Sequence, residues 1–170
     1  MKEIIRDVPN FPKEGIIFKD ITPLLGDPAA FQKMINSLKD RYADKQVDVV
    51  VGVEARGFIF ASALAYALGT GVVMVRKPGK LPYKTFRETY ALEYGTDTVE
   101  VHQDAFQPGQ NIIIIDDVLA TGGTLAATLD LIQKNFKDVK VLEAAFLIEL
   151  DFLKGREKLK NTPIHSIIHY

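Results

Sequence analysis

Four consecutive isoleucines, Ile112 to Ile115, limit the fold of this chain more than any other feature. Because every residue in the run is apolar and β-branched, it predicts a strand that is buried on both faces, as at the centre of a parallel sheet. Two acids follow at Asp116 and Asp117, and a short segment then leads into a predicted helix that begins near Gly123. A strand, a loop and a helix in this order are typical of α/β proteins.

Strand and helix patterns alternate along most of the 170 residues. Short β-branched runs predict the strands, and apolar residues at helical spacing predict the helices. In chain order, the predicted elements are a helix from Asp27 to Tyr42, a strand at 47–53, a helix at 57–68, strands at 72–75 and 111–115, a helix from 123, a strand at 139–148, a short helix at 152–159 and a strand at 164–168. This order predicts one α/β domain, residues 1–170, with a mostly parallel central sheet flanked by helices.

Two stretches break the alternation. Residues 8–26 are rich in prolines and glycines, and residues 77–110 form a long segment rich in lysine, proline, glycine and tyrosine. Long insertions in compact domains are usually functional or mobile. Within the second stretch, 85–94 and 98–102 alternate enough to predict a hairpin, with Gly95 near its turn.

The composition excludes several classes of function. There is no cysteine, so disulfides, thiolate zinc sites and thiol nucleophiles are absent. A formal net charge of −1 does not suggest a nucleic-acid or membrane surface, and no window approaches the roughly 20 apolar residues of a membrane span. The N-terminus has no apolar stretch typical of a secretory signal, so we expect a cytoplasmic protein. His102, His165 and His169 have no metal-ligand spacing and are interpreted as structural.

The segment from Asp116 to Thr124 combines groups that suit phosphate and ribose. In open α/β sheets, ligands bind beyond the carboxyl ends of the strands. Gly122 and Gly123 allow the backbone to approach a ligand closely, and N–H groups at the helix start can hold a phosphate. The hydroxyls of Thr121 and Thr124 can donate to the same oxygens. The two carboxylates suit ribose hydroxyls or a hydrated Mg²⁺.

This segment is neither a P-loop, because Gly-Lys-Ser/Thr is absent, nor the dinucleotide fingerprint G-x-G-x-x-G. A tight turn with a capping threonine is the structural alternative, and the isoleucine strand and acid pair in front of it count against that. The segment resembles the motif with which type I phosphoribosyltransferases bind 5-phosphoribosyl-1-diphosphate (PRPP). The resemblance implies that Ala120 to Thr124 hold the 5′-phosphate and that Asp116 and Asp117 face the ribose hydroxyls, near an Mg²⁺ ion carried by PRPP.

Further segments resemble the adenine-specific members of this family. They are Phe11–Leu25, Arg76–Pro82, Tyr90–Gly95 and Lys154–Leu159, and with them the resemblance covers essentially the whole chain. It implies the type I phosphoribosyltransferase fold, with a small N-terminal hood that binds the base, residues 1–26.

In the predicted hood, a flat base needs an apolar slot with few polar groups. Phe18 offers a stacking face, and the resemblance implies that backbone groups of Ile17 and Lys19 read the adenine edge. Many relatives have arginine where Lys19 stands, which matters little if the contact is through the main chain. Plain core packing is the alternative for the apolar run that begins at Ile16.

A second strand-to-helix turn, with Glu54, Ala55, Arg56 and Gly57, lies where the family binds diphosphate. Arg56 can clamp phosphate oxygens through two hydrogen bonds, and Gly57 opens a helix whose first N–H groups are free. The resemblance implies a cis peptide bond between Glu54 and Ala55. A surface arginine is the alternative for Arg56 considered alone.

A basic cluster follows, formed by Arg76, Lys77, Lys80, Lys84 and Arg87. A substrate with a monophosphate and a diphosphate requires such charge, and we expect the first three of these residues to contact the diphosphate. A solvated basic loop is the alternative. The resemblance implies a homodimer in which basic residues of this region reach the neighbouring site.

By this resemblance, the reaction is adenine + PRPP giving AMP + diphosphate, a step of purine salvage. The transition state is expected to be oxocarbenium-like, with negative charge on the departing diphosphate that Mg²⁺ and basic groups stabilise. The flexible loop region 77–110 would close over the site and exclude water. In it, Glu93 matches an acid near the purine that assists proton transfer and Tyr94 helps to close the loop, while Arg56 completes the catalytic set.

Three alternative functions keep the PRPP scaffold but differ in the base or in the reaction. The base could be hypoxanthine, guanine, xanthine or orotate, against which the Phe11–Leu25 element argues. A PRPP-sensing regulator would usually append a DNA-binding domain, for which 170 residues leave no room. A PRPP-synthesising diphosphokinase would need about twice the chain and an ATP site.

Overall fold

A five-stranded parallel sheet forms the centre of residues 42–170, one of the two units into which the chain divides. The computed structural model describes residues 1–91, 95–159 and 161–170. The sheet has the strand order β4-β3-β7-β8-β9, and each neighbouring pair is parallel. Its strands are β3 (Val49–Val53), β4 (Gly71–Val75), β7 (Asn111–Leu119), β8 (Lys140–Glu149) and β9 (Ile164–His169). The predicted parallel central sheet is confirmed.

The isoleucine run lies in the central strand, β7. None of its four residues is more than 1% exposed, because α-helices cover both faces of the sheet. The predicted strand ended at Ile115, whereas β7 continues to Leu119 because β8 remains paired with it as far as Glu149. Asp116 and Asp117 therefore belong to the strand itself, which fixes their backbone.

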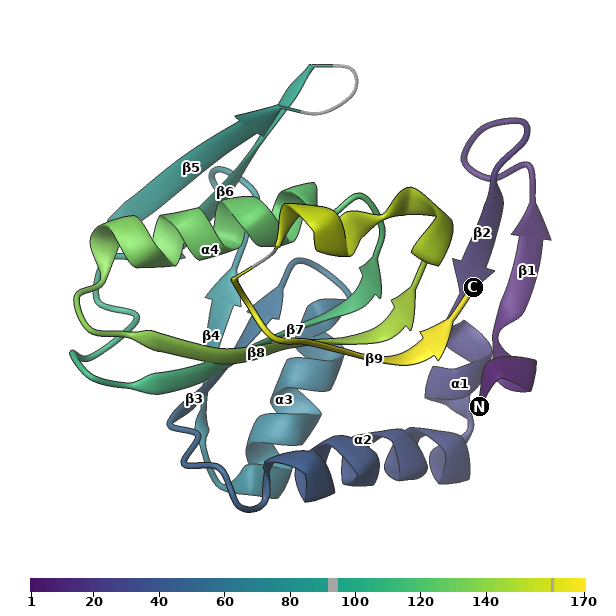
Figure 1. Ribbon diagram of the computed structural model, residues 1–170, viewed down its shortest axis with the longest axis horizontal. Coiled ribbons are helices and arrows are strands. Elements are labelled where there is room, and N and C mark those ends of the chain that lie inside the picture. Colours follow the sequence, from purple (N-terminus) through teal and green to yellow (C-terminus); the bar gives the residue numbers. More distant parts are fainter. Residues whose placement is uncertain (92–94, 160) are drawn as a thin grey trace. The chain divides into compact units, whose positions relative to one another are not determined.

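The helices α3 (Gly57–Leu68) and α4 (Gly123–Asn135) lie on opposite faces of this sheet (Figure 1). Gly52 of β3 lies beneath α3, where an added Cβ would come 2.8 Å from Cβ of Ala61. On the other face, Leu125, Leu129 and Ile132 of α4 join the core cluster, as their helical spacing predicts.

The predicted hairpin is present as β5 (Thr85–Ala91) and β6 (Thr96–His102), which pair in antiparallel fashion. Phe86 of β5 packs edge-to-face on Phe136 after α4, with ring centroids 5.5 Å apart. Backbone bonds in both directions join Glu100 of β6 to Arg76, at 2.9 and 2.8 Å. The hairpin is thus attached to α4 and to the segment that follows β4.

The predicted helix at 152–159 is wrong. Two short 3₁₀ turns replace it, η2 (Asp151–Leu153) and η3 (Gly155–Lys158). Lys154 between them has φ 52°, a left-handed conformation that a continuous helix cannot contain.

The N-terminal unit, residues 1–41, contains the predicted hood. Its elements are η1 (Lys2–Ile4), β1 (Arg6–Pro9), β2 (Ile17–Asp20), α1 (Thr22–Gly26) and α2 (Pro28–Tyr42), the last of which ends in the second unit. β1 and β2 form an antiparallel pair that the sequence did not predict. Asp27 Oδ1 accepts a 2.9 Å hydrogen bond from Ala30 N, so the predicted cap of α2 is confirmed. Within the described residues, no helix has the length and apolar character to cross a membrane.

Candidate active site

The loop between β7 and α4 brings four of the five predicted phosphate-binding residues around one pocket, all except Gly123. Its lining includes Asp116, Ala120, Thr121, Gly122 and Thr124. Gly122 has φ 77°, a left-handed conformation that glycine adopts without strain. The first N–H groups of a helix have no acceptor within the helix, so the start of α4 offers free donors to an anion.

Two acids lie behind this loop, Asp117 buried and Asp116 partly exposed. Asp117 is 5% exposed, and its Oδ2 lies 2.7 Å from Arg56 Nε. Burial raises the pKa of Asp116, and the neighbouring charge of Asp117 raises it further. Burial also raises the pKa of Asp117, although Arg56 opposes that shift. Acids with raised pKa values beside a pocket are typical of functional sites.

The two predicted strand-to-helix turns lie side by side. A Cβ added to Gly57 would come 2.8 Å from the carbonyl oxygen of Ile115 and 2.9 Å from Asp116 Oδ1. Only glycine therefore allows the start of α3 to approach the acids so closely. The Glu54–Ala55 peptide bond is cis, as the resemblance implied.

Glu54 holds the basic segment that follows β4. Its Oε2 accepts hydrogen bonds from Lys77 N at 2.7 Å and from Arg76 Nε at 3.2 Å, and its Oε1 accepts from Arg76 Nη2 at 3.3 Å. Burial alone would raise the pKa of Glu54, but the bond from Lys77 and the Arg76 guanidinium lower it overall. Arg76 also donates to the carbonyl oxygen of Lys80, at 3.2 Å. Four of the predicted diphosphate-binding residues, with Glu54 among them, are thus held together.

A segment near the C-terminus, which includes Gly155 and Arg156, packs against the β7–α4 loop. A Cβ on Gly155 would lie 2.3 Å from the carbonyl oxygen of Ala120, and one on Gly122 would lie 2.5 Å from that of Gly155. Arg156 holds the segment through two hydrogen bonds to Glu149, at 2.5 and 2.7 Å. The sequence analysis identified Lys154–Leu159 only by its resemblance to the family. Gly155 next to the basic residue Arg156 was the only local pattern that could have indicated this supporting role.

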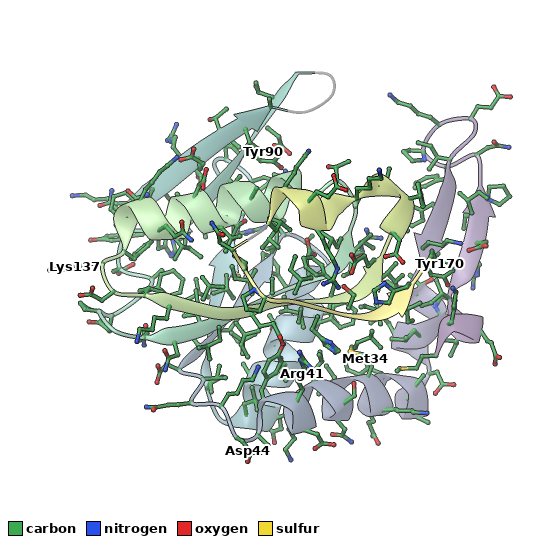
Figure 2. The ribbon with its side chains drawn as sticks, viewed as in Figure 1. Met34, Arg41, Asp44, Tyr90, Lys137 and Tyr170 are labelled. Carbon is green, nitrogen blue, oxygen red and sulfur yellow. The ribbon has the colours of Figure 1, made fainter. Side chains whose placement is uncertain are left out.

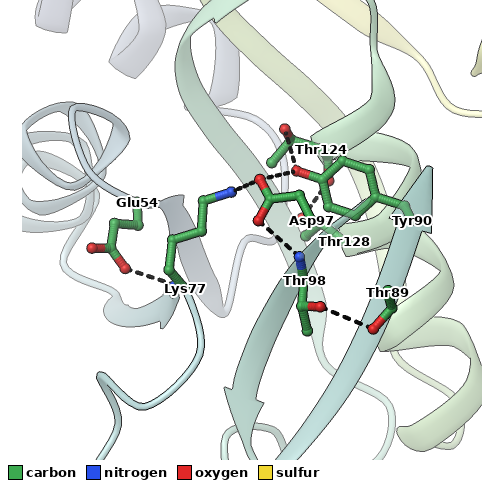
Figure 3. A network of polar contacts seen from close by, with 8 residues as sticks. All are labelled: Glu54, Lys77, Thr89, Tyr90, Asp97, Thr98, Thr124 and Thr128. Atoms are coloured by element: carbon green, nitrogen blue, oxygen red, sulfur yellow. Dashed lines mark hydrogen bonds and ion pairs between the residues drawn. The ribbon is translucent and has the colours of Figure 1, made fainter. Parts of the chain in front are cut away.

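The hairpin contacts the same loop. Tyr90 of β5 points toward α4 (Figure 2), and its hydroxyl lies 3.0 Å from Thr124 Oγ1. The same hydroxyl lies 3.1 Å from Asp97 of β6, which also pairs with Lys77 (Figure 3). Sequence reasoning assigned no role to Asp97, and no local pattern marked it.

The predicted base-binding residues lie on β2 in the N-terminal unit. Ile17 is 57% exposed, which does not fit plain core packing. Phe18 lies edge-to-face with Phe11 at a centroid distance of 5.1 Å, and Lys19 Nζ lies 2.6 Å from Asp7 Oδ1. The predicted catalytic residues at positions 93 and 94 lie outside the described residues.

The histidines give one observation that their spacing did not predict. Possible ligand atoms of Glu149, Asp151 and His169 lie within 4.8 Å of one another. Arg156 already binds both carboxylate oxygens of Glu149, so this group is stabilised by an ion pair. His169 Nδ1 lies 2.9 Å from Asp151 Oδ1, which agrees with a structural role.

Known proteins resemble this chain over its full length. Residues 22–164 match the family model described as the phosphoribosyl transferase domain. A protein of Syntrophotalea carbinolica named adenine phosphoribosyltransferase is 54% identical over 170 residues, which cover 100% of this chain and 98% of that protein. One of the same name from Chloroflexus aurantiacus is 53% identical, with 100% and 97% covered.

Solved structures of proteins with the same name are also similar to this chain. The adenine phosphoribosyltransferase of Thermoanaerobacter pseudethanolicus superposes with a TM-score of 0.94 at 48% identity, covering 99% of this chain and 97% of that one. The Saccharomyces cerevisiae enzyme, solved with adenine and an imino-altritol bisphosphate, has a TM-score of 0.89 at 46% identity and coverages of 96% and 93%.

Proposed function

The chain belongs to the phosphoribosyl transferase domain family, and we propose that its strand-to-helix loops hold PRPP while adenine displaces diphosphate to give AMP. It has the activity of an adenine phosphoribosyltransferase, which returns free adenine to the nucleotide pool. The observation that carries the residue assignment is the β7–α4 loop, where Asp116, Gly122 and Thr124 at the start of α4 line one pocket.

In this assignment, Ala120 to Thr124 bind the 5′-phosphate. The backbone donors of the loop and the hydroxyl of Thr121 bind the anion, and the hydroxyl of Thr124 joins them once it turns from Tyr90. The backbone of Gly155 packs closely against the loop. Asp116 and Asp117 accept hydrogen bonds from the ribose hydroxyls.

Arg56, Arg76, Lys77 and Lys80 receive the diphosphate. Their charges oppose the negative charge that develops on the leaving group, in a site where partial burial strengthens the interaction. Glu54 orients two of them, because its carboxylate is bonded to Arg76 and to the backbone of Lys77. The chemistry is a displacement at the anomeric carbon and requires no covalent enzyme intermediate.

Mg²⁺ fits this site by the chemistry of its donors. Carboxylate oxygens are preferred ligands of Mg²⁺, and Asp116, which lines the pocket, is the acid better placed to hold it. Bound with PRPP, the ion would neutralise part of the diphosphate charge. Ionisation of Asp116 would then be favoured by the cation.

Adenine is assigned to the N-terminal hood, with Phe18 as its stacking face and the backbones of Ile17 and Lys19 reading its edge. The exposure of Ile17 supports this assignment, because an apolar side chain at a substrate site stays uncovered until the substrate binds. Glu93 assists proton transfer at the base and Tyr94 closes the loop.

A homodimer in the cytoplasm completes the proposal. Its support is the exposure of four apolar side chains on α3 and on the edge strand β4, which are Ile59, Tyr66, Val72 and Met74, with Tyr66 91% exposed. Exposed apolar faces are typical of protein–protein contacts. Sedimentation of wild type and Tyr66→Arg should give a dimer and a monomer respectively, and a wild-type monomer would contradict this part.

The residue assignment is tested by PRPP binding, measured calorimetrically with Mg²⁺. Thr121→Val should raise the Kd for PRPP about tenfold, because one hydrogen bond to a charged oxygen is lost. Thr70→Val, the same change in the turn before β4, is the matched control and should leave Kd unchanged. Equal Kd values for Thr121→Val and wild type would contradict the phosphate assignment, and PRPP binding without turnover would favour the regulator.

A further inference from the structure

A chain of polar contacts joins the basic segment to the phosphate loop through the hairpin (Figure 3). Asp97 lies opposite Tyr90 in the β5–β6 register. Asp97 Oδ2 accepts hydrogen bonds from Lys77 Nζ and from the Tyr90 hydroxyl, the latter at 3.1 Å. The Tyr90 oxygen in turn lies 3.0 Å from Thr124 Oγ1.

The number of available protons fixes the direction of these bonds. Burial alone would raise the pKa of Asp97, but the bonds from Lys77 and from Thr98 N lower it overall, so the carboxylate is ionised at neutral pH and only accepts. Tyr90 has one hydroxyl proton, which it donates to Asp97. Thr124 must therefore donate its own proton to Tyr90. In this arrangement the Thr124 hydroxyl has no proton left for a phosphate.

We propose that Asp97 is a positioning residue that sets the affinity for PRPP, by holding Lys77 and, through Tyr90, the hydroxyl proton of Thr124. The inference rests on the proposed function, in which Lys77 and Thr124 contact phosphate groups. A carboxylate and a phosphate attract the same donors. PRPP must therefore compete with Asp97 for both side chains before it can bind with full strength.

Only side chains need to move in this exchange. The backbone of Lys77 is held by Glu54, at 2.7 Å, and the carbonyl oxygen of Thr124 accepts a 2.8 Å bond from Thr128 Oγ1. The Tyr90 ring lies against Gly123, where an added Cβ would be 3.5 Å from it. The loop and the basic segment thus keep their places while Lys77 and Thr124 turn toward the substrate.

The test is the Kd for PRPP with Mg²⁺, measured calorimetrically, together with the KM values for both substrates. Asp97→Asn should lower the Kd and KM for PRPP about three- to tenfold, the range of one net hydrogen bond, and leave the KM for adenine unchanged. Tyr90→Phe keeps the aromatic ring and leaves the charge of Asp97 in place, but removes the hydroxyl. It should also lower the Kd for PRPP. The double variant should gain less than the sum of the two in free energy, because both act on one network.

The matched control is Glu88→Gln, which removes one negative charge from the same hairpin. Glu88 pairs with Lys134 on α4, outside the network, and its replacement should leave the Kd for PRPP unchanged. An equal gain in PRPP affinity by this control would mean that the loss of any negative charge from the hairpin is sufficient, and would overturn the inference. Unchanged or weaker PRPP binding by Asp97→Asn would also overturn it.

Thr124→Val separates this inference from the proposed function. Weaker PRPP binding by Thr124→Val, without a gain in Asp97→Asn, would leave the phosphate assignment standing and reject the role of Asp97. Unchanged binding by Thr124→Val would reject the phosphate assignment and, with it, the inference.

Discussion

Arg56 Nε lies 2.7 Å from Asp117 Oδ2, so the turn between β3 and α3 is tied directly to the acid pair of the central strand. Arg56 enters from the turn between β3 and α3, and Asp117 lies within β7. The contact therefore couples the turn that is assigned to the diphosphate to the strand whose acids are assigned to the ribose.

Arg56→Gln should weaken both folding and PRPP binding. It leaves Asp117 buried without its cation, which should lower the free energy of unfolding by about 1–3 kcal/mol at neutral pH. It also removes a charged donor from the diphosphate, which should raise the KM for PRPP more than tenfold. Urea unfolding and steady-state kinetics measure the two effects. The stability loss should shrink as falling pH protonates Asp117, and an unchanged KM would remove Arg56 from the site.

Asp116→Asn should stabilise the protein at neutral pH and lower its activity. Burial raises the pKa of Asp116 above the ordinary 3.8, so the folded state binds this proton more tightly than the unfolded state. Stability then falls as pH rises from 3.8 through the folded pKa. The amide avoids that cost, with a gain of about 0.5–2 kcal/mol at neutral pH.

The gain for Asp116→Asn should vanish below pH 3.8, where the carboxyl is protonated in both states. Urea midpoints of wild type and variant across this range measure the difference. A variant that is less stable than wild type at neutral pH would contradict the raised pKa.

Gly155→Ala should disturb the phosphate loop from a distance. The new methyl would lie 2.3 Å from the carbonyl oxygen of Ala120, so backbone must move, at a cost of about 1–3 kcal/mol. Because the shift acts on the loop, the KM for PRPP should rise while the KM for adenine stays the same. Gly71→Ala is the control, since nothing lies within 4 Å of its added Cβ, and it should match wild type. Wild-type kinetics for Gly155→Ala would exclude a supporting role.

Glu93→Gln should lower kcat much more than it raises the KM for PRPP. The expected role of Glu93 is proton transfer at the base, which affects the transition state more than ground-state binding. Steady-state kinetics with both substrates measure the split. An unchanged kcat would remove Glu93 from the catalytic set.

Local sequence patterns predicted much of the sheet and the loop. The isoleucine run and the helix starting at Gly123 were correct because burial on both faces and helical spacing are local properties. The prediction of a helix at 152–159 was wrong because Lys154 adopts a left-handed conformation, which is uncommon for lysine and cannot be predicted from the residue type. β7 extends through the acids because β8 pairs with it, which is a long-range effect.

The residues that support the candidate site could not be predicted from local patterns, because their roles also depend on long-range contacts. Gly155 matters because it meets Ala120 and Gly122, more than thirty residues earlier in the printed sequence. Asp97 meets Tyr90 across the hairpin and Lys77 in the segment that follows β4, twenty residues away in the sequence. Such contacts are created by tertiary packing and leave no periodic signal.

The central claim is tested most directly by a turnover assay with PRPP and Mg²⁺, in which adenine, hypoxanthine, guanine, xanthine and orotate are offered in parallel. Nucleotide formation with adenine alone is the predicted result. Turnover with another base, and none with adenine, would contradict the assignment of adenine to the hood that contains Phe18.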